Sequence, residues 1–124
     1  MKILLPPSET KRPGGSPTPL DLARLALPSL TAQREQVVTA LVTLSDDPAV
    51  AARVLKLSER QRGDIDVNAG LRTAPTMAAV DRYTGVLYDA LDAASLVGAA
   101  RRWLGEHVLI HSAPLGPVSA LDRI

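Results

Sequence analysis

The chain has 124 residues, 46% of them hydrophobic, and carries 14 Lys and Arg against 13 Asp and Glu. This length suits one small domain at most, and a net charge of +1 gives no long-range attraction to nucleic acid or anionic lipid. The lack of cysteine excludes disulfides, thiolate nucleophiles and Cys-ligated zinc, and no apolar run is long enough for a signal peptide or a membrane span, which predicts a cytoplasmic protein without membrane contact.

The N-terminal residues 2–5 form a short apolar run that two prolines end. Since its side chains do not alternate between polar and apolar, the run predicts a strand in the centre of a sheet. Residues 6–19 contain five prolines and the adjacent glycines Gly14 and Gly15. This composition predicts a loop.

Helix signals fill residues 31–104 and predict a layer of four to five helices. Apolar residues at helical spacing support the first helix, at residues 31–45. The dipeptide Asp47-Pro48 supplies an N-cap and a suitable first residue for a second helix. A capping box at residues 58–61 starts a third helix, which we expect to end near residue 69.

Two further helices are expected after Pro75. The fourth covers residues 75–91 and continues through Gly85, although a glycine inside a helix costs about 1 kcal/mol. The fifth covers residues 95–104, and Gly105 is expected to end it.

Residues 107–113 predict a second central, buried strand, and the residues after it leave no room for another complete element. Because two strands do not make a stable sheet, we expect the missing strands to come from an absent C-terminal half or from another chain. The predicted fold class is therefore α/β of mixed α+β character. Residues 1–124 are expected to form the N-terminal portion of a larger single domain.

Polar residues follow both predicted strands, where α/β proteins often bind ligands. Ser8 and Lys11 come directly after the first strand, and Ser112 ends the second. A solvated polar turn is the alternative interpretation of the segment 8–11. The neighbouring His111 does not make a hydrolase triad with Ser112, because adjacent strand residues point to opposite faces and no third group is identifiable.

Five sequence blocks resemble, in order, the peroxide stress protein YaaA family (UPF0246). They are the strand and polar turn at residues 2–11, Leu57-Ser58 before a helix that ends at Asn68, the segment Leu71-Arg-Thr-Ala-Pro75, the segment Asp81-Arg-Tyr-Thr-Gly-Val-Leu-Tyr-Asp-Ala-Leu91, and the segment His111-Ser-Ala-Pro-Leu-Gly116. The spacing Asp-x-Tyr-Thr-Gly-x-x-Tyr is the most specific of these features. It accounts for Tyr83 and for the glycine, Gly85, inside a predicted helix.

The resemblance implies a cytoplasmic protein of peroxide resistance that limits free iron and oxidative DNA damage. It also implies binding to double-stranded or distorted DNA through a helix-hairpin-helix-like element within residues 48–91. The DNA-contacting candidates there are Arg60, Arg62, Asn68 and Arg72. A non-enzymatic protein without a cofactor or metal site is the preferred interpretation.

The alternative is an uncharacterised enzyme or a small-ligand-binding α/β protein with a polar site at the strand ends. The cleft candidates for this alternative are Ser8, Lys11, Tyr83, Gly85 and Ser112. Asp64 and Asp66 do not predict a metal site, because the sequence lacks the ligand series and closing Glu of an EF-hand.

Overall fold

A computed structural model describes all residues, 1–124, and contains a mixed three-stranded sheet with six α-helices. Strand β1 (Ile3–Leu5) runs parallel to β2 (Val108–Ser112), and β2 pairs antiparallel with β3 (Gly116–Ser119). The strand order β1-β2-β3 makes β2 the central strand. The predicted α/β fold class of mixed α+β character is confirmed.

Two features of the sheet differ from the sequence prediction. Within residues 1–124, strand β1 has one neighbour and is an edge strand, and Leu4 is 61% exposed. An apolar run indicates that a strand can be buried, but it does not indicate whether a second strand pairs with it. Strand β3 was missed because its Gly and Pro residues are typical of a turn, although Pro117 is tolerated in an edge strand.

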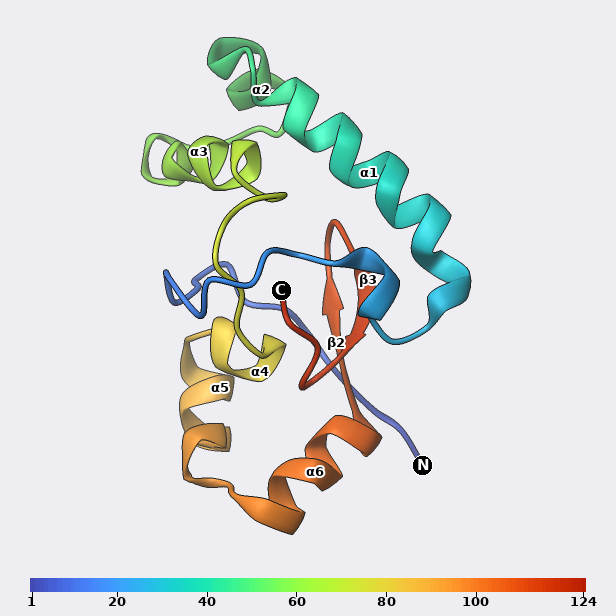
Figure 1. Cartoon of the computed structure of the whole chain (residues 1–124). Helices are drawn as coiled ribbons and strands as arrows, with labels where there is room; N and C mark the ends of the chain where they lie inside the picture. Colours follow the sequence, from blue (N-terminus) through green and yellow to red (C-terminus); the bar gives the residue numbers. More distant parts are fainter.

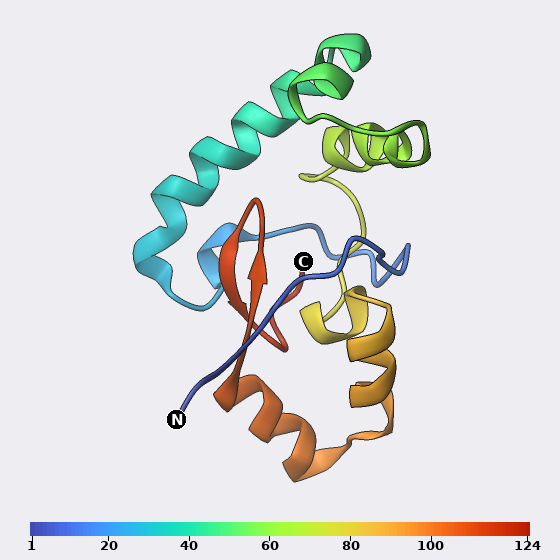
Figure 2. The same ribbon diagram turned by 180° about the vertical axis from the view of Figure 1, so that it is seen from behind.

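The helices lie at the two ends of the molecule, with the strands between them (Figures 1 and 2). Helices α1 (Thr31–Leu44), α2 (Pro48–Val54) and α3 (Gly63–Ala69) form one end. Helices α4 (Ala79–Arg82), α5 (Val86–Leu91) and α6 (Gly98–His107) form the other. None of them has the length and hydrophobicity to cross a bilayer.

The capping signals of the first helical group are present in the structure. The Asp47 carboxylate accepts a hydrogen bond from the Val50 amide at 3.2 Å, so it caps α2. The Gln61 side chain accepts from the Ser58 amide at 3.1 Å. This capping box opens a 3₁₀ turn, Glu59–Gln61, and the α-helix proper begins two residues later.

The single helix expected at residues 75–91 is instead two short helices, α4 and α5. The chain between them is extended at Tyr83, and Gly85 has a φ of 109°. The backbone between the two helices forms hydrogen bonds with the N-terminal loop. The Arg12 amide donates to the Arg82 carbonyl at 2.7 Å, and the Thr84 amide donates to the Thr10 carbonyl at 3.1 Å. Tertiary hydrogen bonds therefore override the helical pattern.

The expectation that Gly105 ends a helix was also wrong, because α6 continues to His107. A Cβ atom at position 105 would lie 2.8 Å from the Cδ1 atom of Leu121. Gly105 therefore permits close packing of α6 against the C-terminal segment.

One main core lies between the sheet and the helices, and a smaller cluster lies within the first helical group. Leu, Val, Ile and Ala side chains and both tyrosines build the main core. The smaller cluster contains Ala51, Ala52 and Ile65, from α2 and α3. Burial of these apolar side chains stabilises the fold by about 25 cal/mol per Å².

The guanidinium of Arg34 on α1 is buried, with the residue only 2% exposed. It donates to the carbonyls of Leu115, in the β2–β3 turn, and of Pro117, on β3, at 2.7 Å each. It also donates to the carbonyls of Ala26 at 2.7 Å and Leu27 at 3.3 Å. Burial lowers the pKa of Arg34 from its usual value, and Asp122 offsets part of this effect. Arg34 thus connects α1, the hairpin and the preceding loop.

Replacement of Arg34 by Met should lower the free energy of unfolding by about 2–4 kcal/mol, because buried carbonyls lose their donors. Chemical denaturation followed by circular dichroism measures the change. Arg24→Met is the matched control and should stay within about 0.5 kcal/mol of the parent, because Arg24 is exposed. An unchanged midpoint for Arg34→Met would show that these hydrogen bonds do not support the fold.

Candidate functional site

A pocket of about 290 Å³ lies at the carboxyl ends of the parallel strands β1 and β2. We call it the strand-end pocket; it is lined by Pro7, Ser8, Glu9, Lys11, Gln61, Asp64, Tyr83, Ala113 and Pro114. The lining combines the loops after both strands with the start of α3. No group of three His, Asp or Glu side chains in the structure could hold a metal ion.

Hydroxyl groups hold the first part of the loop in place. The Thr84 hydroxyl contacts the Thr10 hydroxyl at 2.9 Å, and the Thr10 hydroxyl lies 3.2 Å from that of Ser8. The Ser8 oxygen also accepts from the Thr10 amide at 3.2 Å. A Cβ atom at Gly85 would lie 3.3 Å from the Ser8 oxygen, so glycine allows this close approach.

Two stacked tyrosines form the floor beneath the loop. The rings of Tyr83 and Tyr88 have centroids 5.5 Å apart. The Tyr88 hydroxyl donates to the Pro6 carbonyl at 2.5 Å, and the Lys11 ammonium lies 5.9 Å from the Tyr83 ring centroid. Burial is the main cause that raises the pKa of Tyr88 to about 12, with Tyr83 adding to it. Burial also raises the pKa of Tyr83, and the Ser112 hydroxyl offsets part of this increase. Both phenols are therefore neutral near pH 7.

The structure brings three cleft candidates, Ser8, Lys11 and Tyr83, into one pocket. Gly85 lies against the back of the same loop. Ser112 is buried beside the pocket rather than in its lining, and its oxygen accepts from the Leu115 amide at 3.3 Å. His111 is exposed, so it points away from Ser112 as expected for adjacent strand residues.

Sequence reasoning missed the contribution of α3 to the pocket. Gln61 and Asp64 lie about fifty residues after Ser8 in the sequence. The local sequence pattern does not predict that they line the same pocket. The capping box was the available signal, since it fixes the orientation of the Gln61 side chain.

Of the four DNA-contacting candidates, Arg60 and Arg62 lie on the turn before α3, Asn68 lies in its last turn, and Arg72 follows it. Arg60 is exposed and outside the ion pairs of the structure, whereas Arg62 pairs with Glu59 at 3.1 Å. Asn68 is half-buried near the end of α3. Arg72 bonds to Glu35 and Thr39 on α1, at 2.5 and 2.7 Å. Of the three arginines, Arg60 alone is therefore outside an ion pair.

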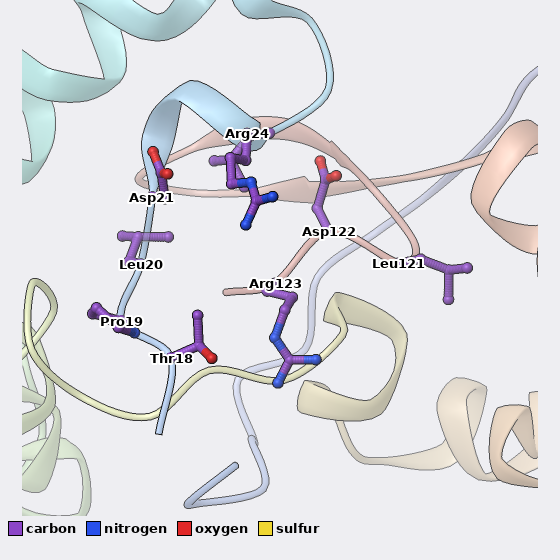
Figure 3. Close-up of a pocket in the computed structure, with 9 residues that line it drawn as sticks. Thr18, Pro19, Leu20, Asp21, Arg24, Leu121, Asp122 and Arg123 are labelled. Atoms are coloured by element: carbon purple, nitrogen blue, oxygen red, sulfur yellow. The ribbon is translucent and has the colours of Figure 1, made fainter. Parts of the chain in front are cut away.

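A second pocket, of about 490 Å³, lies between residues 18–25 and 121–123 (Figure 3). Two of its polar side chains, Asp122 and Arg123, hold the C-terminal segment against its neighbours. The Asp122 carboxylate accepts from the amides of Ala26 and Ser119 at 2.7 and 2.9 Å. Arg123 donates to the Thr76 carbonyl at 2.6 Å. These contacts give Asp122 and Arg123 a structural role.

Comparison with known proteins identifies relatives along the whole chain. A family described as "Peroxide stress protein YaaA" matches residues 1–124. The chain is 52% identical over 124 residues to a UPF0246 protein of Corynebacterium efficiens. It is 48% identical over 125 residues to a UPF0246 protein of Streptomyces coelicolor. Each match covers 100% of this chain and 48% of the relative, so the chain spans about half the length of these curated relatives.

Replacement of Gly85 by Ala should destabilise the protein by about 1–3 kcal/mol, because its φ of 109° is strained for any other residue. Gly63→Ala is the matched control: no atom lies within 4 Å of a Cβ there, and alanine in α3 should be neutral or stabilising by up to about 1 kcal/mol. Urea denaturation of both variants measures the difference. Equal stabilities would contradict the assigned role of Gly85.

Proposed function

Because the chain belongs to the peroxide stress protein YaaA family, we propose that it takes part in resistance to hydrogen peroxide in the cytoplasm. The family match over the full chain is the observation that carries this proposal. Limiting free iron acts upstream of hydroxyl-radical formation and so protects DNA from oxidation. In this proposal iron limitation is a cellular consequence rather than a result of iron bound to residues 1–124.

The proposal includes contact with double-stranded or distorted DNA through the helical pair α2–α3. Arg60 supports it as an exposed cation on the turn that joins these helices. The ion pair of Arg62 with Glu59 is exposed on both sides, at 54% and 84%, so phosphate can compete for this guanidinium. Asn68 and Arg72 are secondary candidates, because Arg72 is held against α1.

The double variant Arg60→Ala/Arg62→Ala should bind DNA more weakly than the parent, since each lost phosphate contact lowers the salt slope by about 1. Fluorescence anisotropy with a duplex and a bubble substrate at two salt concentrations measures this. Arg102→Ala, on α6 at the other end of the molecule, is the matched control and should bind like the parent. A DNA affinity that does not depend on salt, or an unchanged affinity of the double variant, would refute the proposed interface.

We further propose that a strand from outside residues 1–124 pairs with the open edge of β1. Exposed apolar side chains, Ile3 and Leu4, support this, as does the chain's span of 48% of its relatives. Mixing the chain with the unmatched part of the C. efficiens relative should give a complex in analytical ultracentrifugation and slower amide exchange in β1.

In the same experiment Leu4→Lys should weaken the complex, because it places a charge on the paired edge. Val97→Lys, at an exposed apolar residue outside the sheet, should not weaken the complex. Failure of the two parts to associate would remove the proposal.

A further inference from the structure

Three charged side chains meet in the strand-end pocket without a protein partner of opposite charge. Lys11 supplies one ammonium, and Glu9 and Asp64 supply two carboxylates. The ion pairs of the structure are Arg62–Glu59, Arg72–Glu35 and Arg101–Asp81, so none of the three pocket residues takes part in one. Opposite charges that line one cavity without pairing are available to a ligand.

Two neutral side chains of the pocket, Gln61 and Ser8, carry hydrogen-bond donors that a ligand can reach. The Gln61 carbonyl oxygen accepts both the amide of Ser58 at 3.1 Å and its hydroxyl at 3.0 Å. These contacts fix the orientation of the side chain and leave its NH₂ group free to donate. The Ser8 oxygen accepts from the Thr10 amide, and its proton is shared with the Thr10 hydroxyl at 3.2 Å, so a ligand oxygen competes with Thr10 for it. Lys11, Gln61 and Ser8 thus offer donors to a carboxylate, beside the acceptors Glu9 and Asp64.

We propose that the strand-end pocket binds a small zwitterion of amino-acid size, with its carboxylate bound by Lys11, Ser8 and Gln61 and its ammonium bound by Asp64 and Glu9. The charged residues of the lining sum to −1, which disfavours a bare anion. A bare cation would leave Lys11 unpaired. A ligand that carries both charges satisfies every free group at once.

The size and position of the cavity agree with this ligand class. A volume of about 290 Å³ lies at the small end of ligand sites, which run from about 300 to 1,000 Å³. The carboxyl ends of parallel strands are a common ligand position in α/β proteins. This inference goes beyond the proposed role in peroxide stress, because it needs neither DNA nor iron.

Titration of the ¹⁵N-labelled chain with glycine, L-serine and L-glutamine tests the proposal. At least one should shift the amide resonances of residues 8–11, 61–64 and 113, with a Kd in the millimolar range, about 1–10 mM. Acetate and ethylamine, each with a single charge, should bind at least about tenfold more weakly at matched ionic strength. Equal binding of acetate would identify an oxyanion site instead, and no shift up to about ten times that Kd would overturn the proposal.

Two variants locate the charges. Lys11→Met and Asp64→Asn should each weaken binding about tenfold, because each leaves one ligand charge unpaired. Asp46→Asn is the matched control, since Asp46 is exposed and outside the pocket lining. Unfolding midpoints show whether the variants are folded. If one variant is unfolded, the comparison of single-charge and zwitterionic probes on the parent chain still tests the proposal. Full affinity in both folded variants would refute the assignment.

Discussion

The buried guanidinium of Arg34 is the constraint on which the arrangement of the two helical groups depends. No carboxylate forms an ion pair with it, so four backbone carbonyls must be in place together to satisfy it. These carbonyls come from the loop before α1 and from the β2–β3 turn. A charge that is buried without such partners costs several kcal/mol, so α1 and the hairpin must form together. Because α1 leads into α2 and α3, Arg34 also sets where α3 meets the strand ends.

A second constraint fixes the loop that carries Ser8 and Lys11. The segment Tyr83–Gly85 pairs with this loop through backbone hydrogen bonds, and Arg82 donates to the carbonyls of Arg12 at 2.6 Å and Ile124 at 3.0 Å. Burial lowers the pKa of Arg82, and the nearby Arg123 lowers it further. The loop after β1 is therefore held in one conformation although its composition is typical of a flexible connection. This explains how a proline-rich segment can position side chains for binding.

Local signals in the sequence predicted the elements that local interactions stabilise. The Asp47 cap, the capping box at Ser58 and the apolar run of β2 all gave the correct elements. The errors arose where tertiary contacts dominate: the break at Gly85 and strand β3 depend on partners far away in the sequence. The same distinction applies to the site. Position after a strand placed Ser8 and Lys11 together, whereas Asp64 joins them only through the packing of α3.

The two proposed binding surfaces share one short turn. We assign Arg60 and Arg62 to DNA binding. Gln61 lies between them in the sequence and Asp64 follows them, and these two residues line the strand-end pocket. The proposed ligand is a zwitterion, so its binding leaves the net charge beside these arginines unchanged. Any coupling between the two proposed sites must therefore act through the position of the shared turn, and it must be reciprocal: the ligand and DNA change each other's affinity by the same factor.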